Sequence, residues 1–179
     1  MSQRNADVAD QARELIRDVP DYPKPGIMFK DITPLLANSE AFTAVTHAMA
    51  QPFISLGATH IVAIESRGFI FGGPIAQELS AGFVPVRKPG KLPSQRRREE
   101  YDLEYGTDIL EIHADAVDES SRVLIVDDVL ATGGTAAATC RLVESLGATV
   151  IGLSFLAALS FLPGLARLEA RTVHSIVTY

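Results

Sequence analysis

Two acidic residues followed closely by a glycine-rich turn form a pattern that can hold a phosphorylated sugar. Asp127 and Asp128 end an apolar run at residues 123–126. The turn that follows consists of Ala131, Thr132, Gly133, Gly134 and Thr135. Glycines allow backbone N–H groups to approach a phosphate closely, and a helix that begins here adds the positive end of its dipole. The two carboxylates can then accept hydrogen bonds from the sugar hydroxyls.

The same pattern argues against the common nucleotide-binding motifs. A P-loop would place Lys before the final Ser or Thr, and a dinucleotide fingerprint would read G-x-G-x-x-G, but residues 123–135 read VLIVDDVLATGGT. The segment resembles the signature of the phosphoribosyltransferases, which bind phosphoribosyl pyrophosphate (PRPP). The alternative is a buried strand with an ordinary turn, which would leave the acidic pair and the TGGT turn without a packing role.

Two other polar segments directly follow apolar runs and could bind further phosphates. Residues 65–69 read ESRGF, where Ser66 and Arg67 offer a hydroxyl and a planar guanidinium suited to phosphate oxygens. Residues 87–91 read RKPGK. Clustered cations, together with Mg2+, are a usual way to stabilise departing pyrophosphate. The alternatives are an exposed arginine paired with a surface carboxylate and a solvated basic turn.

The order of apolar and polar segments predicts alternating strands and helices. We expect helices over residues 10–19, 39–56, 72–81 and 134–146, the second capped by Ser39, and strands over 60–64, 83–87, 109–113, 123–126, 149–156 and 173–177. This pattern predicts one doubly wound α/β domain over 1–179 with a mostly parallel central sheet and an N-terminal segment over 1–36. Ligands of such sheets bind beyond the carboxyl ends of the strands.

A polar, charge-dense segment at residues 89–108 interrupts the α/β alternation. An irregular loop of roughly 20 residues in a compact domain is uncommon and often acts as an active-site lid. Its part EEYDLEYG, at 99–106, alternates enough to form a hairpin and contains Tyr101, Glu104 and Tyr105. We expect the arginines at 96–98 to pair locally with Glu99 and Glu100.

Composition limits the partners and the compartment. The 179 residues carry a net charge of −6, which gives no general attraction to nucleic acid or to an anionic membrane. The polar N-terminus and the lack of an 18-residue apolar run predict neither a signal peptide nor a transmembrane helix. We therefore expect a cytoplasmic protein. The single Cys140 predicts no internal disulfide, and the spacing of the four histidines predicts no metal site built by the protein.

Five segments together resemble the adenine branch of the type I phosphoribosyltransferase family. They are DYPKPGIMFKDITPLL at 21–36, ESRGF at 65–69, RKPGKLP at 87–93, EEYDLEYG at 99–106 and VDDVLATGGT at 126–135. The last segment alone indicates only the superfamily, whereas KPGIMFKDI and LEYG are typical of the adenine branch. The resemblance implies that adenine and PRPP give AMP and pyrophosphate in purine salvage, with Mg2+ as cofactor, in a homodimer.

The resemblance also assigns roles to individual residues. The PRPP 5′-phosphate and ribose would be bound by Asp127, Asp128, Ala131, Thr132, Gly133, Gly134 and Thr135. Pyrophosphate would be bound by Ser66, Arg67, Arg87, Lys88 and Lys91, with one cation of 87–91 reaching the site of a neighbouring subunit. Adenine would be bound in a hood by Met28, Phe29 and Lys30. The lid would include Tyr101, Glu104 and Tyr105, and the catalytic residues would be Glu104 and Arg67. Mg2+ would be held mainly through PRPP and water, with no direct protein ligand.

The chain departs from the family pattern near its C-terminus, and two other functions remain open. Ala158 and the pair Gly164 and Leu165 stand where the family typically has Glu and a Gly-Arg turn. One alternative is an enzyme for hypoxanthine, guanine, xanthine or orotate, although no side chain is clearly positioned to donate to a purine O6. The other is a regulator that senses PRPP, which the acidic charge and the lack of an added DNA-binding domain disfavour.

Overall fold

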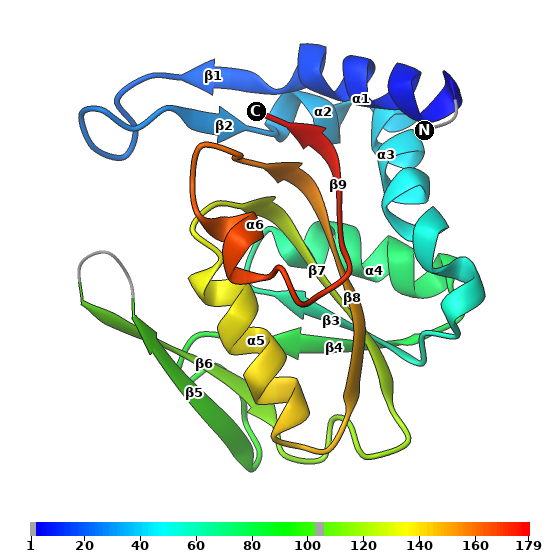
Figure 1. Cartoon of the computed structure of the whole chain (residues 1–179), viewed down its shortest axis with the longest axis vertical. Coiled ribbons are helices and arrows are strands. Elements are labelled where there is room, and N and C mark those ends of the chain that lie inside the picture. The colour runs from blue at the N-terminus through cyan, green and yellow to red at the C-terminus, as the bar shows by residue number, and fades with distance from the viewer. Residues whose placement is uncertain (1–2, 103–105) are drawn as a thin grey trace.

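The computed structural model describes residues 3–102 and 106–179 and is built around a parallel sheet (Figure 1). Its five strands lie in the order β4 (Gly82–Val86), β3 (His60–Ile64), β7 (Arg122–Leu130), β8 (Thr149–Ala158) and β9 (Val173–Thr178). All four neighbouring pairs are parallel. The predicted α/β fold with a mostly parallel central sheet is confirmed.

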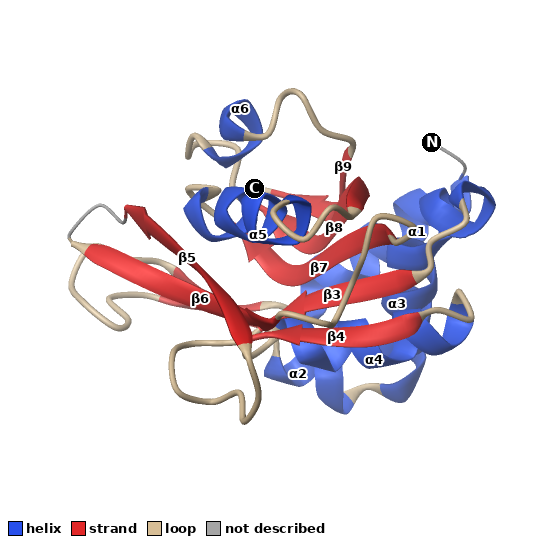
Figure 2. Ribbon diagram, turned by 90° about the horizontal axis from the view of Figure 1, so that it is seen from below, coloured by secondary structure: helices blue, strands red, loops and turns tan. Residues whose placement is uncertain are grey.

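Both faces of the sheet are covered by helices, which explains the continuous apolar runs of its strands. Along β7, Val123 and Ile125 pack on the side of α5 (Gly134–Glu144). Leu124 and Val126 pack on the other side, with α1 (Gln3–Leu15), α3 (Ser39–Ala50) and α4 (Gly68–Glu78). Figure 2 shows α5 on one side of the sheet and α3 and α4 on the other. Successive residues of one strand thus support two separate cores.

The strand order places a crevice at the carboxyl ends of β3 and β7. After β3 the chain passes through α4 to β4 on one side, and later returns to β7 on the other side of β3. Loops that follow two such strands leave in opposite directions and open a crevice between them. The register pairs Ala63 of β3 with Val126 of β7. Residues 65–69 and the end of β7 with the turn that follows it therefore lie on the two sides of this crevice.

Two small antiparallel sheets lie outside the central one. The first pairs β1 (Arg17–Val19) with β2 (Phe29–Asp31) and is followed by α2 (Thr33–Ala37). The second is a hairpin of β5 (Arg96–Asp102) and β6 (Thr107–His113), which lies beside α5 (Figure 1). A short 3-10 helix (Gln51–Leu56) precedes β3, and α6 (Gly164–Arg167) precedes β9.

Several predicted boundaries are wrong, for reasons that are local. The first helix ends at Leu15, and Arg17–Val19 forms a strand because it pairs with β2. The second predicted helix corresponds to α3, which ends at Ala50, just before Pro52. Its N-cap is Asn38 and not Ser39, since the Asn38 side chain accepts from the Ala41 N–H at 3.0 Å. The helix predicted from 72 begins at Gly68.

The segment predicted as a lid contains more regular structure than a loop. β5 begins at Arg96 and β6 at Thr107, so the irregular part that precedes the hairpin is short. The pairing of β5 with β6 agrees with the hairpin suggested by the alternation at 99–106, and residues 103–105 lie outside the described residues. None of the described helices is long and apolar enough to cross a membrane.

Candidate active site

The crevice holds a cavity of about 390 Å³ in which the three predicted phosphate-binding segments meet. Its polar lining residues are Glu65, Ser66, Arg67, Lys88, Asp127, Asp128 and Thr135. A smaller cavity of about 90 Å³ adjoins it and is lined by the turn that includes Thr132 and Gly133. Residues that lie more than 60 positions apart in the sequence are thus brought to one site by the parallel order of β3 and β7.

The glycine-rich turn is held in a conformation that favours glycine. Gly133 has φ +77° and caps α5, whose first residue is Gly134. A Cβ on Gly133 would lie 2.9 Å from the carbonyl oxygen of Gly164. In turn, a Cβ on Gly164 would lie 2.2 Å from the carbonyl oxygen of Ala131. The start of α6 therefore packs directly on this turn, and the N–H groups of the first turn of α5 are available to an anion.

The acidic pair lies between the turn and Arg67. Asp128 is buried, and its Oδ2 is 2.8 Å from Arg67 Nε. The Asp128 N–H donates to Asp127 Oδ1 at 2.9 Å. Desolvation and the neighbouring Asp128 carboxylate raise the pKa of Asp127 well above its usual value. Desolvation also raises the pKa of Asp128, although the Arg67 guanidinium opposes this shift.

The raised pKa of Asp127 predicts that this side chain costs stability at neutral pH. A carboxyl whose pKa is higher in the folded state favours folding when protonated, and this contribution is lost as the pH rises through the folded pKa. We expect Asp127→Asn to increase the free energy of unfolding at pH 7, since the amide removes an unfavourable charge and its oxygen can still accept from the Asp128 N–H. The gain over wild type should shrink as the pH falls to about 4.

Denaturant unfolding of both proteins at the two pH values measures this difference. Asp115→Asn, at an exposed turn position, is the matched control and should leave the free energy of unfolding nearly unchanged at both pH values. A loss of stability in Asp127→Asn at pH 7 would contradict the prediction.

The basic loop at 87–91 is bound to carboxylates of the chain. Glu65, whose side chain is 9% exposed, accepts from Arg87 Nε at 3.2 Å and from the Lys88 N–H at 3.0 Å, and it also binds Lys91 Nζ. Burial opposes ionisation of Glu65, but the hydrogen bonds from Lys91, Lys88 and Arg87 lower its pKa below the usual value. The Lys88 ammonium is paired with Asp108 of β6.

Tyr101 connects the hairpin to the glycine-rich turn. Its side chain is buried, and its hydroxyl donates to Asp108 Oδ2 at 3.2 Å and accepts from Thr135 Oγ1 at 3.1 Å. Nearby, Arg141 of α5 contacts Glu99 of β5 at 2.6 Å. The predicted lid residues Glu104 and Tyr105 lie outside the described residues, so only Tyr101 of this set is placed.

The predicted pairing of the three arginines with Glu99 and Glu100 is wrong. Arg96 and Arg98 both pair with Glu111, while Glu99 pairs with Arg141. Neighbouring residues of a strand point to opposite faces, so Arg98 cannot easily reach Glu99. It can reach Glu111, which is its partner in the register across the hairpin.

Part of the segment predicted as a hood lies next to the crevice. The ring centroid of Phe29 is 5.0 Å from Arg67 Cζ and 5.0 Å from the ring centroid of Tyr22. Met28 is 48% exposed. Lys30 points elsewhere, since its Nζ is 2.6 Å from Asp18 Oδ1 and 3.7 Å from the ring centroid of Tyr179. Phe29 therefore lies beside a side chain of the crevice, whereas the Lys30 ammonium is paired away from it.

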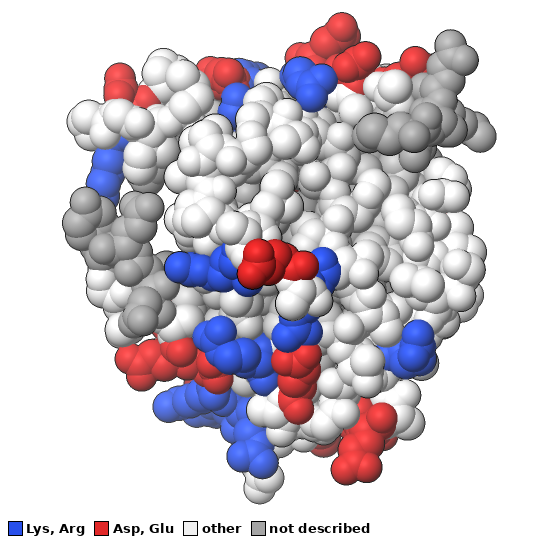
Figure 3. Space-filling view, in the orientation of Figure 1, with Lys and Arg blue, Asp and Glu red and all other residues white. Residues whose placement is uncertain are grey.

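Sequence reasoning did not identify the carboxylates that hold the cations. Glu65 carried a signal, because it follows a buried strand and begins the segment that contains Arg67. Asp108 and Glu111 carried none, because they lie at alternating positions of an ordinary strand pattern. On the face seen in Figure 3, many Lys and Arg side chains likewise lie beside Asp and Glu side chains.

Comparison with known proteins connects this crevice to one family. The family model of the phosphoribosyl transferase domain matches residues 31–176. Over 167 residues, the chain is 55% identical to an adenine phosphoribosyltransferase of Rhodopirellula baltica, covering 93% of this chain and 81% of the relative. The solved structure of an adenine phosphoribosyltransferase from Rhodothermus marinus matches with a TM-score of 0.93 and 51% identity, covering 97% of this chain and 99% of that one. One from Thermoanaerobacter pseudethanolicus also has a TM-score of 0.93, with 50% identity, and covers 96% and 99%.

Proposed function

This chain belongs to the phosphoribosyltransferase family, and we propose that it transfers the 5-phosphoribosyl group of PRPP to adenine, giving AMP and pyrophosphate. The observation that carries the proposal is the single cavity lined by the acidic pair, Arg67, Lys88 and Thr135. A sugar diol, a pyrophosphate and a 5′-phosphate require these groups within the length of one PRPP molecule. The adenine activity of relatives that share about half of their residues with this chain supports the choice of base.

The proposed binding mode divides PRPP among three segments. The backbone N–H groups and hydroxyls of 131–135 would bind the 5′-phosphate at the start of α5. The carboxylates of Asp127 and Asp128 would accept from the ribose hydroxyls. The pyrophosphate would be bound by Ser66 and the cations, which are Arg67, Arg87, Lys88 and Lys91.

Stabilisation of the leaving group would be the main contribution to the rate. The bond from ribose C1 to the pyrophosphate oxygen breaks, and a bond from C1 to purine N9 forms. Negative charge grows on pyrophosphate as it departs, and the fixed guanidinium of Arg67 can stabilise this charge in the transition state. The purine loses a proton in the same reaction. By resemblance, the Glu104 carboxylate would stabilise the positive charge that develops on its imidazole ring.

The residues present fit an Mg2+ ion that arrives with PRPP. Among the described residues there is no group of three or more His, Cys, Asp or Glu side chains that could hold a metal ion. Mg2+ usually keeps several waters and binds substrate phosphates, so it would be held mainly through PRPP and water, with no direct protein ligand. When bound, Mg2+ would neutralise part of the charge on pyrophosphate.

The hood would bind the base. Phe29 would stack on the purine, and the position of its ring next to Arg67 supports this role. Main-chain groups near Met28 and Lys30 would read the exocyclic amine of adenine. We further propose a homodimer in the cytoplasm, without nucleic-acid or membrane partners, on the basis of the family resemblance and the acidic net charge.

Product formation from PRPP and Mg2+ with each of adenine, hypoxanthine, guanine, xanthine and orotate tests the proposed function. We expect AMP and an equal amount of pyrophosphate with adenine, and at most trace product with the others. Turnover with another base alone would overturn the base assignment and keep the phosphoribosyl transfer. PRPP binding without turnover on any base would instead favour a PRPP-sensing regulator.

A further inference from the structure

We propose that Glu111 is a positioning residue that fixes the basic loop at 87–91 for pyrophosphate and couples this loop to the β5–β6 hairpin. The inference rests on the proposed function, because it takes 87–91 as the pyrophosphate-binding loop. Glu111 lies on β6 and is fully buried, with 0% exposure. It does not line the main cavity, so its action would be indirect.

Glu111 binds both ends of the turn in the basic loop. Its backbone pairs with Arg87, with N···O distances of 2.9 Å from the Arg87 N–H and 2.8 Å to the Arg87 carbonyl oxygen. Its side-chain Oε2 accepts from the Gly90 N–H at 3.0 Å. Gly90 has φ +81°, so the turn reverses direction at the residue that this carboxylate holds. Lys88 lies between these two contacts, and Lys91 follows them directly.

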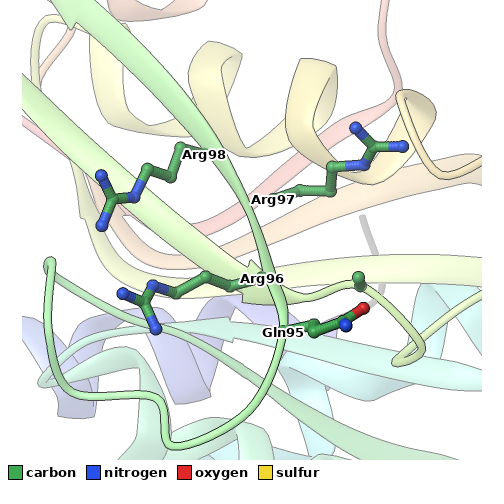
Figure 4. Close-up of a pocket in the computed structure, with 5 residues that line it drawn as sticks. Gln95, Arg96, Arg97 and Arg98 are labelled. Carbon is green, nitrogen blue, oxygen red and sulfur yellow. The ribbon is translucent and has the colours of Figure 1, made fainter.

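The other oxygen of Glu111 is held by the hairpin. Oε1 accepts from Arg96 Nε at 3.1 Å and from Arg98 Nε at 2.6 Å. Figure 4 shows the side chains of Arg96 and Arg98 extending to one side of the strand and that of Arg97 extending to the other. A fully buried carboxylate is costly unless it is paired and hydrogen-bonded. The two guanidiniums thus allow a charged acceptor to lie beneath the basic loop.

Glu111 thus links the basic loop to the β5–β6 hairpin, so the position of the loop depends on contacts made by the hairpin. Loss of the Arg98 contact would leave Oε1 with only Arg96, and the carboxylate would gain freedom to turn away from Gly90. The cations on either side of Gly90 would then be less well positioned, and the positioning of charged groups carries much of the binding of a pyrophosphate. The glycine-rich turn would keep its geometry, because β7 and α5 hold it at its two ends and its hydrogen bond to the hairpin, from Thr135 to Tyr101, does not involve Arg98.

The test compares the binding of pyrophosphate, in the presence of Mg2+, with the binding of AMP. AMP would need the glycine-rich turn and the hood, but it would leave the basic loop unused. Dissociation constants are measured by calorimetry for wild type, Arg98→Ala, Glu111→Gln and Arg97→Ala. We expect Arg98→Ala to weaken pyrophosphate binding about tenfold, which corresponds to the loss of one charge-assisted hydrogen bond. AMP binding should change less than about twofold. Glu111→Gln should show the same selectivity with a larger loss.

Arg97→Ala is the matched control, because it removes an arginine from the same strand on the opposite side (Figure 4). It should bind both ligands as wild type does. Equal weakening of both ligands in Arg98→Ala, or no weakening of either, would overturn the inference and leave the proposed function intact. Failure of wild type to bind either ligand would instead count against the proposed function. If Glu111→Gln does not fold, Arg98→Ala still decides, because its side chain is 55% exposed.

Discussion

Arg67→Ala is expected to lower kcat/KM for PRPP by about 10²- to 10³-fold, the loss typical of removing one preorganised donor from a site of developing negative charge. Arg67 contacts Asp128 through Nε at 2.8 Å, which leaves its terminal nitrogens for another anion. Its removal would also leave the buried Asp128 carboxylate without its cation. Steady-state kinetics with PRPP varied at saturating adenine gives the effect.

Two further variants test whether leaving-group stabilisation dominates the rate. We expect both Arg67→Ala and Asp128→Ala to cost more rate than Glu104→Ala, which removes the proposed partner of the purine ring. Arg13→Ala, at an exposed site on α1, is the matched control and should leave the kinetics unchanged. If Glu104→Ala proves to be the slowest of the variants, proton handling on the base contributes more than the departure of pyrophosphate.

Gly68→Ala is expected to lower kcat/KM by at least about 100-fold, because a displacement of about 1 Å in a reacting site can have that effect. A Cβ at this position would lie 2.8 Å from the Val126 carbonyl oxygen and 2.9 Å from Asp127 Oδ1. Both atoms belong to β7, so relief of the clash must separate the Arg67 loop from the acidic pair. The same strain should cost about 1–3 kcal/mol of stability.

Gly73→Ala in the same helix provides the control for this prediction. Apart from its chain neighbours and the backbone of its own helix, no atom lies within 4 Å of the Cβ that Gly73 would gain. The substitution should leave kcat/KM nearly unchanged and should change stability less than Gly68→Ala does, because the helix propensity of alanine is opposed by crowding of its Cβ against the following Pro74. Thermal unfolding and steady-state kinetics on both variants give the comparison. Equal activity of the two variants would show that the close approach at Gly68 has no role in the site.

The central sheet could be predicted because its signal is local. The apolar runs at 60–64 and 123–126 are buried on both faces, and alternation with helical segments is enough to indicate parallel strands. The crevice followed from the same reasoning, because polar residues that end neighbouring parallel strands must meet. The small β1–β2 sheet was missed. Its strands are only three residues long, and they lie among prolines without a periodic pattern.

The partners of the site cations could not be predicted, because they depend on contacts between distant segments. Lys88 pairs with Asp108, 20 residues away, and Lys91 pairs with Glu65, 26 residues away. Neither pairing follows from spacing along one element. The arginines at 96–98 show the same limit, since Glu99 and Glu100 are their neighbours in sequence, whereas Arg96 and Arg98 pair with Glu111 across the hairpin.

Each of the four cations predicted to bind pyrophosphate is paired with a carboxylate of the chain, and this pairing affects how an anion is captured. Arg67, Arg87, Lys88 and Lys91 each have such a partner. The crevice therefore exerts little net field at a distance, and the encounter with a charged ligand gains little from long-range steering. The association rate of such a ligand should therefore vary only weakly with ionic strength. A small anion that displaces a single ion pair gains little, whereas a ligand that displaces several pairs together is favoured, so selectivity arises after contact.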